Sequence, residues 1–295
     1  MRFGVIANMG RPDAEAVVRR IFEWARQKEV SLSLCQRVTD EVETEFPSLP
    51  RRVVAQNSDV IVSLGGDGTL LASARAVGRL GRPILGINLG SLGFLTQLRP
   101  TAVEDTLTAV LEGKYSIEKR MVAEVKVEKG PELDHPYALN DVVIDRGAVS
   151  RIIHMDLFSN NYFICSYAAD GLIISTPTGS TAYALAVGGP ILNPLLDAFI
   201  AVPISAFSLT TRPIIFSDKD VLRVVVKSTH SNPVLTIDGQ ISCSLPKESS
   251  FTIKKADYCI NFIVFRENSF YDVLRSKLHW GRLPESEPGH ELHSD

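Results

Sequence analysis

The 295-residue chain lacks the features that place a protein in a membrane or in an oxidising compartment. No apolar run reaches the roughly 18 residues that span a bilayer, and the apolar part of the N-terminus is too short for a signal peptide. Only four cysteines occur, none of them in a C-x-x-C pair, so neither a disulfide framework nor a zinc site is indicated. We therefore expect a cytoplasmic protein with free thiols and no membrane partner.

An excess of positive charge is also missing. The chain has 31 lysines and arginines against 34 aspartates and glutamates, which gives a formal net charge of −3. Sequence-independent binding to nucleic acid depends on a basic surface, so we do not expect nucleic acid as a partner. A small phosphorylated ligand remains compatible with this charge. Hydrophobic residues make up 45% of the chain, enough for a sizeable core, and the length favours two domains.

Strand and helix patterns alternate over the first third of the chain. The run 59–64 is almost wholly apolar, which is typical of a parallel strand covered on both faces. We predict an α/β domain with a parallel sheet over residues 1–115. Its expected strands lie at 3–8, 32–34, 59–64 and 83–87, and its expected helices at 13–28, 49–56, 69–77 and 102–111.

Near residue 116 the pattern changes to the period of two that is typical of half-buried strands. We predict a mostly β C-terminal domain over 116–266, either a sandwich or a distorted barrel. Helical spacing over 268–280 predicts a C-terminal helix that returns to the first domain, which residues 267–283 complete. The composition of residues 284–295 predicts a disordered tail. Strands are expected at 137–144, 152–158, 162–166, 172–175, 221–226, 234–237, 251–254 and 259–265.

A glycine-rich segment follows the apolar strand at 59–64. The sequence has neither G-x-G-x-x-G nor G-x-x-x-x-G-K-[ST], so the common dinucleotide fingerprint and the P-loop are both absent. It has instead Gly65-Gly66-Asp67-Gly68-Thr69, between a strand and an expected helix. Such turns bind ligands in open α/β folds, and glycines let backbone N–H groups approach a phosphate. The segment therefore indicates phosphoryl transfer.

Asp67 does not fit a simple anion-binding loop, because its carboxylate repels phosphate. Three roles account for it: binding Mg²⁺, accepting a proton from an attacking hydroxyl, or capping the following helix. Asp is a favoured N-cap residue, so the third role is the purely structural one. The three flanking glycines favour a functional role over the cap.

Two further segments are polar within apolar surroundings. Asn140 and Asp141 interrupt an apolar strand; an Asn can pair with a purine edge, and an Asp can accept hydrogen bonds from sugar hydroxyls. A turn or a satisfied buried pair explains them equally well. The segment 170–190 is rich in Ser, Thr and Gly and contains an expected short helix at 181–186. Its structural alternative is a Ser/Thr-rich loop with a helix cap.

Taken together, these segments resemble the NAD kinase family. The resemblance covers nearly the whole chain, and the segment 170–190 is specific, whereas GGDGT is shared with diacylglycerol and sphingosine kinases. The matching pieces are GGDGTLL at 65–71, LGSLGFL at 89–95, LNDVV at 139–143, DGLIISTPTGSTAY at 170–183, GGP at 188–190, SLTTRP at 208–213 and DGQ at 238–240.

The resemblance implies a reaction in which ATP phosphorylates the 2′-hydroxyl of the adenosine ribose of NAD, giving NADP and ADP. It implies that Asp67 accepts the proton and that Gly65, Gly66, Gly68 and Thr69 face the phosphoryl donor. It further implies Mg²⁺ bound with ATP, no fixed metal site on the protein, and a homo-oligomer. The implied NAD-binding residues are Asp67, Gly68, Asn140, Asp141, Arg151, Asp170, Thr181, Ala182, Tyr183, Ala184, Leu185, Ala186 and Gln240.

Two other functions compete with this interpretation. A lipid kinase with the same glycine-rich loop would need an apolar acyl pocket, and residues 139–190 do not suggest one. A non-enzymatic module that binds NAD or NADP would keep the pocket without the reaction, and the intact Asp67 argues against it.

Overall fold

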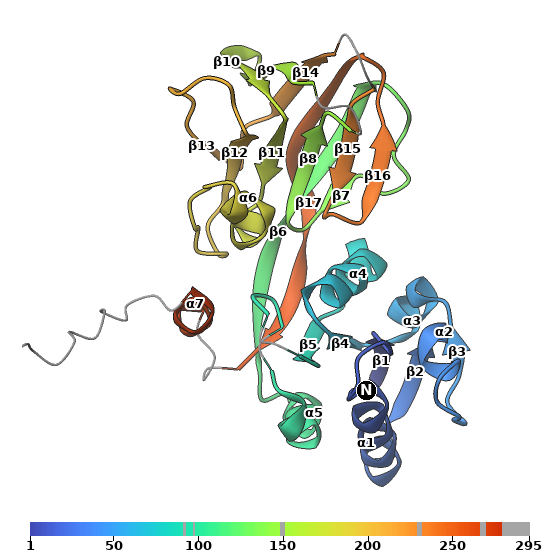
Figure 1. The fold of residues 1–295 in the computed structure, drawn as a ribbon. Coiled ribbons are helices and arrows are strands. Elements are labelled where there is room, and N and C mark those ends of the chain that lie inside the picture. Colours follow the sequence, from blue (N-terminus) through green and yellow to red (C-terminus); the bar gives the residue numbers. More distant parts are fainter. Residues whose placement is uncertain (91–92, 97, 148–150, 229–231, 266–269, 279–295) are drawn as a thin grey trace, which may run out of the picture.

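The computed structural model describes residues 1–90, 93–96, 98–147, 151–228, 232–265 and 270–278. These residues form two halves joined by two long strands (Figure 1). The first half is an α/β layer structure and the second is mostly β, so the predicted fold class is confirmed. The tail expected at 284–295 lies outside the described residues, as do 267–269 and 279–283 of the segment expected to complete the first domain.

The first half is built on a parallel sheet in the order β5-β4-β1-β2-β3. The central strand β4 is buried along its whole length, which explains its nearly continuous apolar sequence. Parallel order places the carboxyl ends of β1, β4 and β5 at one edge. The bounds are β1 (Arg2–Ala7), β2 (Ser31–Cys35), β3 (Ser48–Leu49), β4 (Val60–Gly65) and β5 (Ile84–Asn88).

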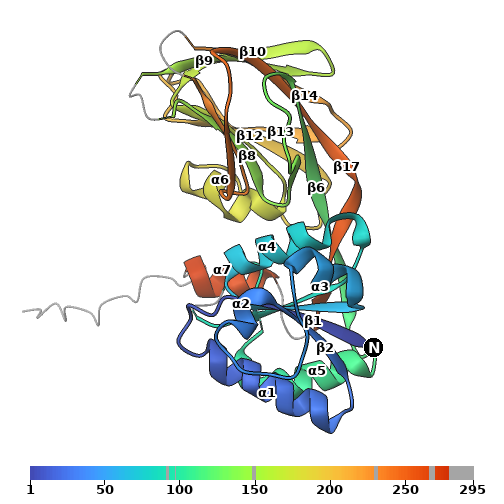
Figure 2. The ribbon, with the colours of Figure 1, turned by 90° about the vertical axis from the view of Figure 1, so that its right-hand side faces the viewer.

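Helices cover both faces of this sheet (Figure 2). On one face lie α1 (Ala14–Gln27) and α5 (Val103–Leu111), joined by a 2.9 Å hydrogen bond from Trp24 Nε1 to Thr108 Oγ1. On the other face lie α3 (Arg51–Asn57) and α4 (Asp67–Val77), next to the short helix α2 (Gln36–Thr39). As a result, α4 separates the sheet from the second half of the molecule.

The second half is a sandwich of two sheets. One sheet has the order β13-β12-β11-β8-β15-β16, and the other contains β10-β9-β14-β17 with β6 beside β17. A single apolar core, which includes Ile174 and Phe251, lies between them. The bounds are β6 (Ser116–Lys129), β7 (Tyr137–Ala138), β8 (Asp141–Asp145), β9 (Ile153–Ser159), β10 (Tyr162–Ala169), β11 (Gly171–Ser175), β12 (Ala198–Ile204), β13 (Ile214–Ser217), β14 (Leu222–Lys227), β15 (Val234–Ile237), β16 (Ile241–Ser244) and β17 (Glu248–Val264).

Strands β6 and β17 run through both halves. They pair antiparallel over most of their length, and β17 also pairs with β5 in parallel through Phe262 and Ile84. Ile260, Phe262 and Ile263 consequently pack in the core of the first half. The two strands expected at 251–254 and 259–265 are one strand, with a register irregularity between Lys255 and Cys259.

The C-terminal helix α7 (Phe270–Leu278) returns to the first half, as predicted, where Lys277 Nζ lies 5.0 Å from the ring centre of Phe94. It also contacts the second half, because Asn193 Nδ2 donates to the Tyr271 hydroxyl at 3.2 Å. None of the helices in the described segments is long and apolar enough to cross a membrane.

Candidate active site

Three loops converge at the carboxyl edge of the parallel sheet. Asn8 N, just after β1, donates to Leu64 O, and Leu89 N, just after β5, donates to Gly65 O. Gly65 has a φ of +155°, and a Cβ there would lie 2.3 Å from Thr69 Oγ1. Only glycine fits this position, because the tight turn brings the helix start back onto the strand end. A Cβ on Gly66 or on Gly68 would make only an ordinary contact with the end of a side chain, Arg11 at 3.9 Å or Gln240 Nε2 at 3.6 Å.

The carboxylate of Asp67 binds the loop that follows β5. Its Oδ2 accepts a 2.9 Å hydrogen bond from Phe94 N, and its Oδ1 accepts three bonds of 3.1 Å from Leu95 N, Thr96 N and Thr96 Oγ1. Helix α4 begins at Asp67, and its N-cap, Gly66, makes no side-chain cap. The capping alternative for Asp67 is therefore wrong: the side chain turns away from its own helix to a neighbouring loop.

Gly93 makes this arrangement sterically feasible. A Cβ on Gly93 would lie 2.1 Å from Asp67 Oδ1, so any other residue would push the carboxylate away. The loop is held further by Asn88, whose Nδ2 donates to Thr96 Oγ1 at 2.9 Å. The motif LGSLGFL thus serves to place donors around Asp67. Oδ2 accepts a single hydrogen bond from the described residues and has capacity for one more.

Asn140 and Asp141 lie at a second cavity, of about 300 Å³, in the β-rich half. Both are buried, and Ala182 and Tyr183 lie across the same cavity. The strand expected over 137–144 is broken here, because β7 ends at Ala138 and β8 begins at Asp141. The break directs the two polar residues into the cavity instead of into the sheet. Five residues that line this cavity were not predicted as site residues: Val143, Asp145, Thr236, Asp238 and Gly239.

Asp238 holds the Asn140-Asp141 segment in place. Its carboxylate accepts hydrogen bonds from the backbone N–H groups of Leu139 (3.0 Å), Asn140 (2.7 Å) and Asp141 (3.2 Å). Burial raises the pKa of Asp238, and the three N–H groups oppose that rise. Burial, together with the nearby charge of Asp238, raises the pKa of Asp141 to about 7. Asp141 therefore changes its protonation state near neutral pH.

Gln240 joins this segment to the glycine-rich loop. Its Nε2 donates to the carbonyl oxygen of Gly68 at 3.0 Å, and its Oε1 accepts a 2.7 Å hydrogen bond from Arg75. Gln240 and Asp238 belong to the same turn, between β15 and β16. The motif DGQ thus ties the GGDGT loop of one half to the Asn140-Asp141 segment of the other.

Two buried polar atoms near this site have no hydrogen-bond partner among the described residues. They are Asn140 Oδ1 and Thr178 Oγ1. Asn140 is 8% exposed and Thr178 is 3% exposed. An unpaired buried polar atom is costly, so each is a candidate contact for a polar ligand.

The segment predicted as a short helix at 181–186 is a 3₁₀ turn over Thr178–Thr181 followed by α6 (Tyr183–Ala186). Gly179 packs so closely on Asn140 that a Cβ would lie 2.1 Å from its carbonyl oxygen. Ala182 and Tyr183 reach the cavity, whereas Ala184 is fully buried in a small core beneath it. Thr181 is half-buried and donates to Thr178 O.

Arg151 and Asp170 do not join this group within one chain. Asp170 precedes β11, and the pairing of β11 with β8 sets Gly171 opposite Asp145 and Ser175 opposite Asp141. Five residues of strand separate Asp170 from Ser175, or about 17 Å. Asp170 is paired instead with Arg146, at 3.2 Å between Nε and Oδ1. Arg151 is exposed, just before β9.

Arg11 is a further cation at the glycine-rich loop that the sequence did not single out. Its guanidinium lies 3.9 Å from the position of a Cβ on Gly66 and 3.5 Å from that of a Cβ on Gly90. The side chain is exposed and comes from the loop after β1. An arginine gives no motif of its own at this position, so only the structure reveals that it faces the loop.

The described residues contain no group of three or more His, Cys, Asp or Glu side chains arranged to hold a metal ion. Asp67 is the carboxylate at the GGDGT loop itself. Mg²⁺ usually keeps several waters and is bound largely through substrate phosphates, so a metal that arrives with a substrate would need little from the protein.

Comparison with known proteins gives a consistent result. Family models described as the ATP-NAD kinase N-terminal and C-terminal domains match residues 3–115 and 139–265. The NAD kinases of Syntrophotalea carbinolica and Heliobacterium modesticaldum are 40% and 39% identical to this chain over 281 residues. Each alignment covers 95% of this chain and 99% of the relative.

Two solved structures are similar in fold. A yeast NADH kinase complexed with NADH has a TM-score of 0.89 at 23% identity, over 97% of this chain and 89% of its own. An NAD kinase from Archaeoglobus fulgidus in complex with ATP has a TM-score of 0.76 at 27% identity, over 93% of this chain and 99% of its own. At 23% identity, the first similarity shows the fold alone.

Proposed function

Since the chain belongs to the NAD kinase family and phosphorylates NAD with ATP to give NADP, we propose how its residues divide this reaction. The adenosine end of NAD binds in the 300 Å³ cavity of the β-rich half. ATP approaches from the GGDGT loop of the α/β half. The turn at 238–240 links the GGDGT loop to the cavity, because it is hydrogen-bonded to both Gly68 and Asn140.

The observation that carries this assignment is the unpaired Oδ1 of Asn140. It is a buried acceptor at the cavity that holds Asp141 and Tyr183. An adenine amino group supplies the missing donor, and the ring has an aromatic neighbour in Tyr183. Asp141 accepts hydrogen bonds from ribose hydroxyls when it is ionised. Gly68 and Gln240, two further residues of the proposed NAD site, are hydrogen-bonded to each other and link the GGDGT loop to the turn at 238–240.

Asp67 acts as the general base through Oδ2, the oxygen that keeps spare capacity. It takes the proton of the 2′-hydroxyl, and the hydroxyl oxygen forms a bond to the γ-phosphorus of ATP. The bond from that phosphorus to the β–γ bridging oxygen breaks, and ADP leaves with the electron pair. The proton then passes from Asp67 to solvent. Four hydrogen bonds fix the carboxylate in position for this step.

The phosphoryl donor is held by Gly65, Gly66, Gly68, Thr69 and, in addition, Arg11. The N-terminus of α4 points its free N–H groups at this loop, and Arg11 adds a full positive charge beside Gly66. Mg²⁺ would enter with ATP and neutralise phosphate charge, held by the phosphates and water, because Oδ1 of Asp67 already accepts three hydrogen bonds and Oδ2 takes the proton.

A homo-oligomer accounts for the positions of Arg151 and Asp170, which the family resemblance places at the NAD site. About 17 Å of strand separates Asp170 from the end of β11 nearest Asp141, so we propose that both residues come from a second copy of the chain. Exposed apolar side chains provide a surface for that copy; Phe207 is 82% exposed and Leu209 is 92% exposed. The four cysteines are free thiols, which supports the cytoplasm as the compartment.

One assay tests the assignment. Purified protein is incubated with ATP, Mg²⁺ and NAD, and NADP is detected with an NADP-dependent dehydrogenase. We expect NADP to form with wild-type protein and to fall sharply with Asp67→Asn. Binding of NAD without NADP formation would identify a binding module instead, and turnover of a diacylglycerol would identify a lipid kinase.

A further inference from the structure

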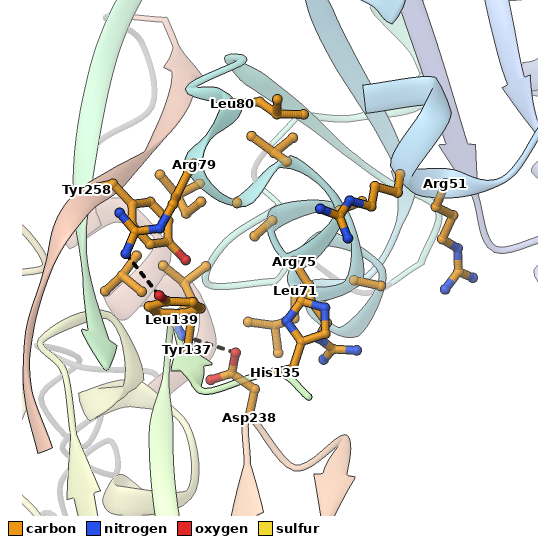
Figure 3. A pocket seen from close by; sticks show the side chains of 18 of the residues that line it. Arg51, Leu71, Arg75, Arg79, Leu80, His135, Tyr137, Leu139, Asp238 and Tyr258 are labelled. Carbon is orange, nitrogen blue, oxygen red and sulfur yellow. Dashed lines mark hydrogen bonds between the residues drawn. The ribbon is translucent and has the colours of Figure 1, made fainter. Parts of the chain in front are cut away.

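A further cavity lies between the two halves of the molecule, separate from the glycine-rich loop. It has a volume of about 530 Å³, in the range of small-molecule sites. Its walls come from α3 and α4 on one side and from β17 and the loop before β7 on the other (Figure 3). Neither Arg11, nor Asp67, nor the loop at 93–96 lines it. We refer to it as the arginine cavity, after Arg51, Arg52 and Arg75.

One end of the arginine cavity concentrates positive charge. Arg51 and Arg52 lie on α3, Arg75 lies on α4, and His135 faces Arg75 from the other half. Burial lowers the pKa of His135, and the charges of Arg75 and Arg52 lower it further. Burial lowers the pKa of Arg75; the charge of Asp238 opposes that effect, and the charge of Arg51 adds to it. The groups therefore repel one another's charge, which an anion between them would relieve.

Two carboxylates, Asp134 and Asp238, also line the cavity and offset part of this charge. Asp238 acts on Arg75 while it accepts hydrogen bonds from three backbone N–H groups, and the exposed Asp134 acts on His135. Within the described part of the chain, neither Arg51 nor Arg52 forms an ion pair with a carboxylate. The charges of Arg51 and Arg52 are thus available to a ligand.

The other end of the arginine cavity is aromatic. Tyr137 and Tyr258 contact each other edge to face, with ring centres 5.2 Å apart. Arg79 stacks over both rings and donates to the Tyr137 hydroxyl at 2.9 Å, and its charge is paired with Asp257. Leu71, Leu139 and Ile260 complete an apolar wall. A ligand with a phosphate at one end and a flat ring at the other matches both ends.

We propose that the arginine cavity is a second nucleotide-binding site, which takes a nucleoside phosphate with its phosphate among Arg51, Arg52, Arg75 and His135. The base lies against Tyr137 and Tyr258. Its ligand is coupled to the active site through Arg75, because Arg75 donates to Gln240 and Gln240 donates to Gly68. A phosphate that attracts Arg75 competes with Gln240 for that guanidinium, and so loosens the contact that positions the GGDGT loop.

The test uses full-length protein saturated with NADP, which occupies the adenosine cavity, and calorimetric titration with AMP. We expect one AMP per chain, with affinity at least tenfold lower in Arg52→Glu. Arg37→Glu, the same charge change on α2 and outside the cavity, should stay within about twofold of wild type. Tyr258→Leu should weaken AMP binding but leave binding of inorganic phosphate unchanged. The cavity would not be a nucleotide site if NADP-saturated protein bound no AMP, or if Arg52→Glu bound it as well as wild type.

Kinetics separate this site from that of the phosphoryl donor. Without AMP, Arg52→Glu should keep the wild-type kcat and KM for ATP; a KM for ATP that rises with the loss of AMP binding would mean that the cavity is the donor site itself. Saturating AMP should raise the KM for NAD more in wild-type protein than in Arg52→Glu, where only competition at the active site remains. Equal effects in the two proteins would overturn the coupling through Arg75.

Discussion

The carboxylate of Asp238 accepts a 2.7 Å hydrogen bond from the backbone N–H of Asn140, 98 residues earlier in the chain. The same carboxylate takes up the N–H groups of Leu139 and Asp141, at the break between β7 and β8. The break would otherwise leave three buried donors without acceptors. Asp238 therefore offsets the energetic cost of breaking the strand in a buried place. The break in turn lets Asn140 and Asp141 lie at the cavity.

Asp238→Asn should disturb this arrangement without removing volume. The carboxamide keeps one acceptor oxygen, but its NH₂ group is a donor and would face at least one backbone N–H donor. The buried mismatch should lower the free energy of unfolding by about 1–3 kcal/mol and raise the KM for NAD, with a smaller effect on the KM for ATP. Urea denaturation and steady-state kinetics measure both. Asp134→Asn is the matched control, because Asp134 is exposed; equal KM values for NAD in the two variants would mean that Asp238 does not position the site.

Asp141 should make stability depend on pH. Its pKa is about 7 in the folded protein, against an ordinary value near 4, so the folded state holds its proton more tightly than the unfolded chain. The resulting stabilisation is fully present below about pH 4 and is lost as pH rises to about 7. At about 1.4 kcal/mol per pKa unit it amounts to about 4 kcal/mol at most.

Asp141→Asn removes this titration while keeping the shape of the side chain. Urea denaturation from pH 4.5 to 8 should show the variant gaining stability relative to wild type as pH rises. Parallel pH curves for the two proteins would show that Asp141 is ionised throughout. A raised pKa also predicts that NAD binding by wild type, but not by the variant, strengthens as pH passes 7.

The fold was largely readable from the sequence, because burial leaves a clear pattern in parallel strands and amphipathic helices. Strand β4 and helix α1 show this well. The pattern failed where local signals conflicted with pairing. Strand β12, which was not predicted, contains Pro203; at that residue it pairs with β11 alone, because its pairing with β13 ends at Ala201. The short strands β13 and β16 and the elements α2 and β3 are too brief for periodicity to detect.

The candidate site was predictable only where a motif marks it. Asp67, the Asn140-Asp141 pair and Gln240 come from three separate motifs, and the structure brings Gln240 to Gly68 and Asp238 to Asn140. No sequence pattern indicates that Asp67 binds the loop at 94–96, since that contact depends on where two strands end in one sheet. Arg11 and the arginine cavity are likewise products of tertiary packing.

Arg11→Met tests the cation at the donor loop. Methionine keeps much of the apolar length but removes the charge beside Gly66. Loss of a charge-assisted contact to phosphate should raise the KM for ATP about tenfold or more, and leave the KM for NAD within about twofold. Arg37→Met removes an equally exposed arginine on α2 and should change neither. If Arg11→Met and Arg37→Met raised the KM for ATP by the same factor, Arg11 would act only through the net charge of the protein and not through a contact with phosphate.

Asp67→Asn is the most informative single change, because the structure gives the carboxylate two separable roles. Asparagine loses the base, and its NH₂ opposes an N–H group of the loop at 94–96, which the carboxylate satisfied. Loss of a general base lowers rates by about 10²–10⁴-fold, so kcat should fall by that order. Asp67→Asn changes both the base and the loop at 94–96, so a second variant is needed to measure the effect of the loop alone.

Thr96→Val isolates the loop. It removes the hydroxyl that donates to Asp67 Oδ1 and accepts from Asn88, but leaves Oδ2 and its bond from Phe94 N in place. Thermal denaturation should show a loss of stability of about 1 kcal/mol, and kcat should stay within about tenfold of wild type. If the two variants lost equal amounts of kcat, the reaction would depend on loop geometry and Asp67 would not be the base. A large loss confined to Asp67→Asn leaves proton transfer as the explanation, because both variants disturb the same loop and only one removes the group that accepts the proton.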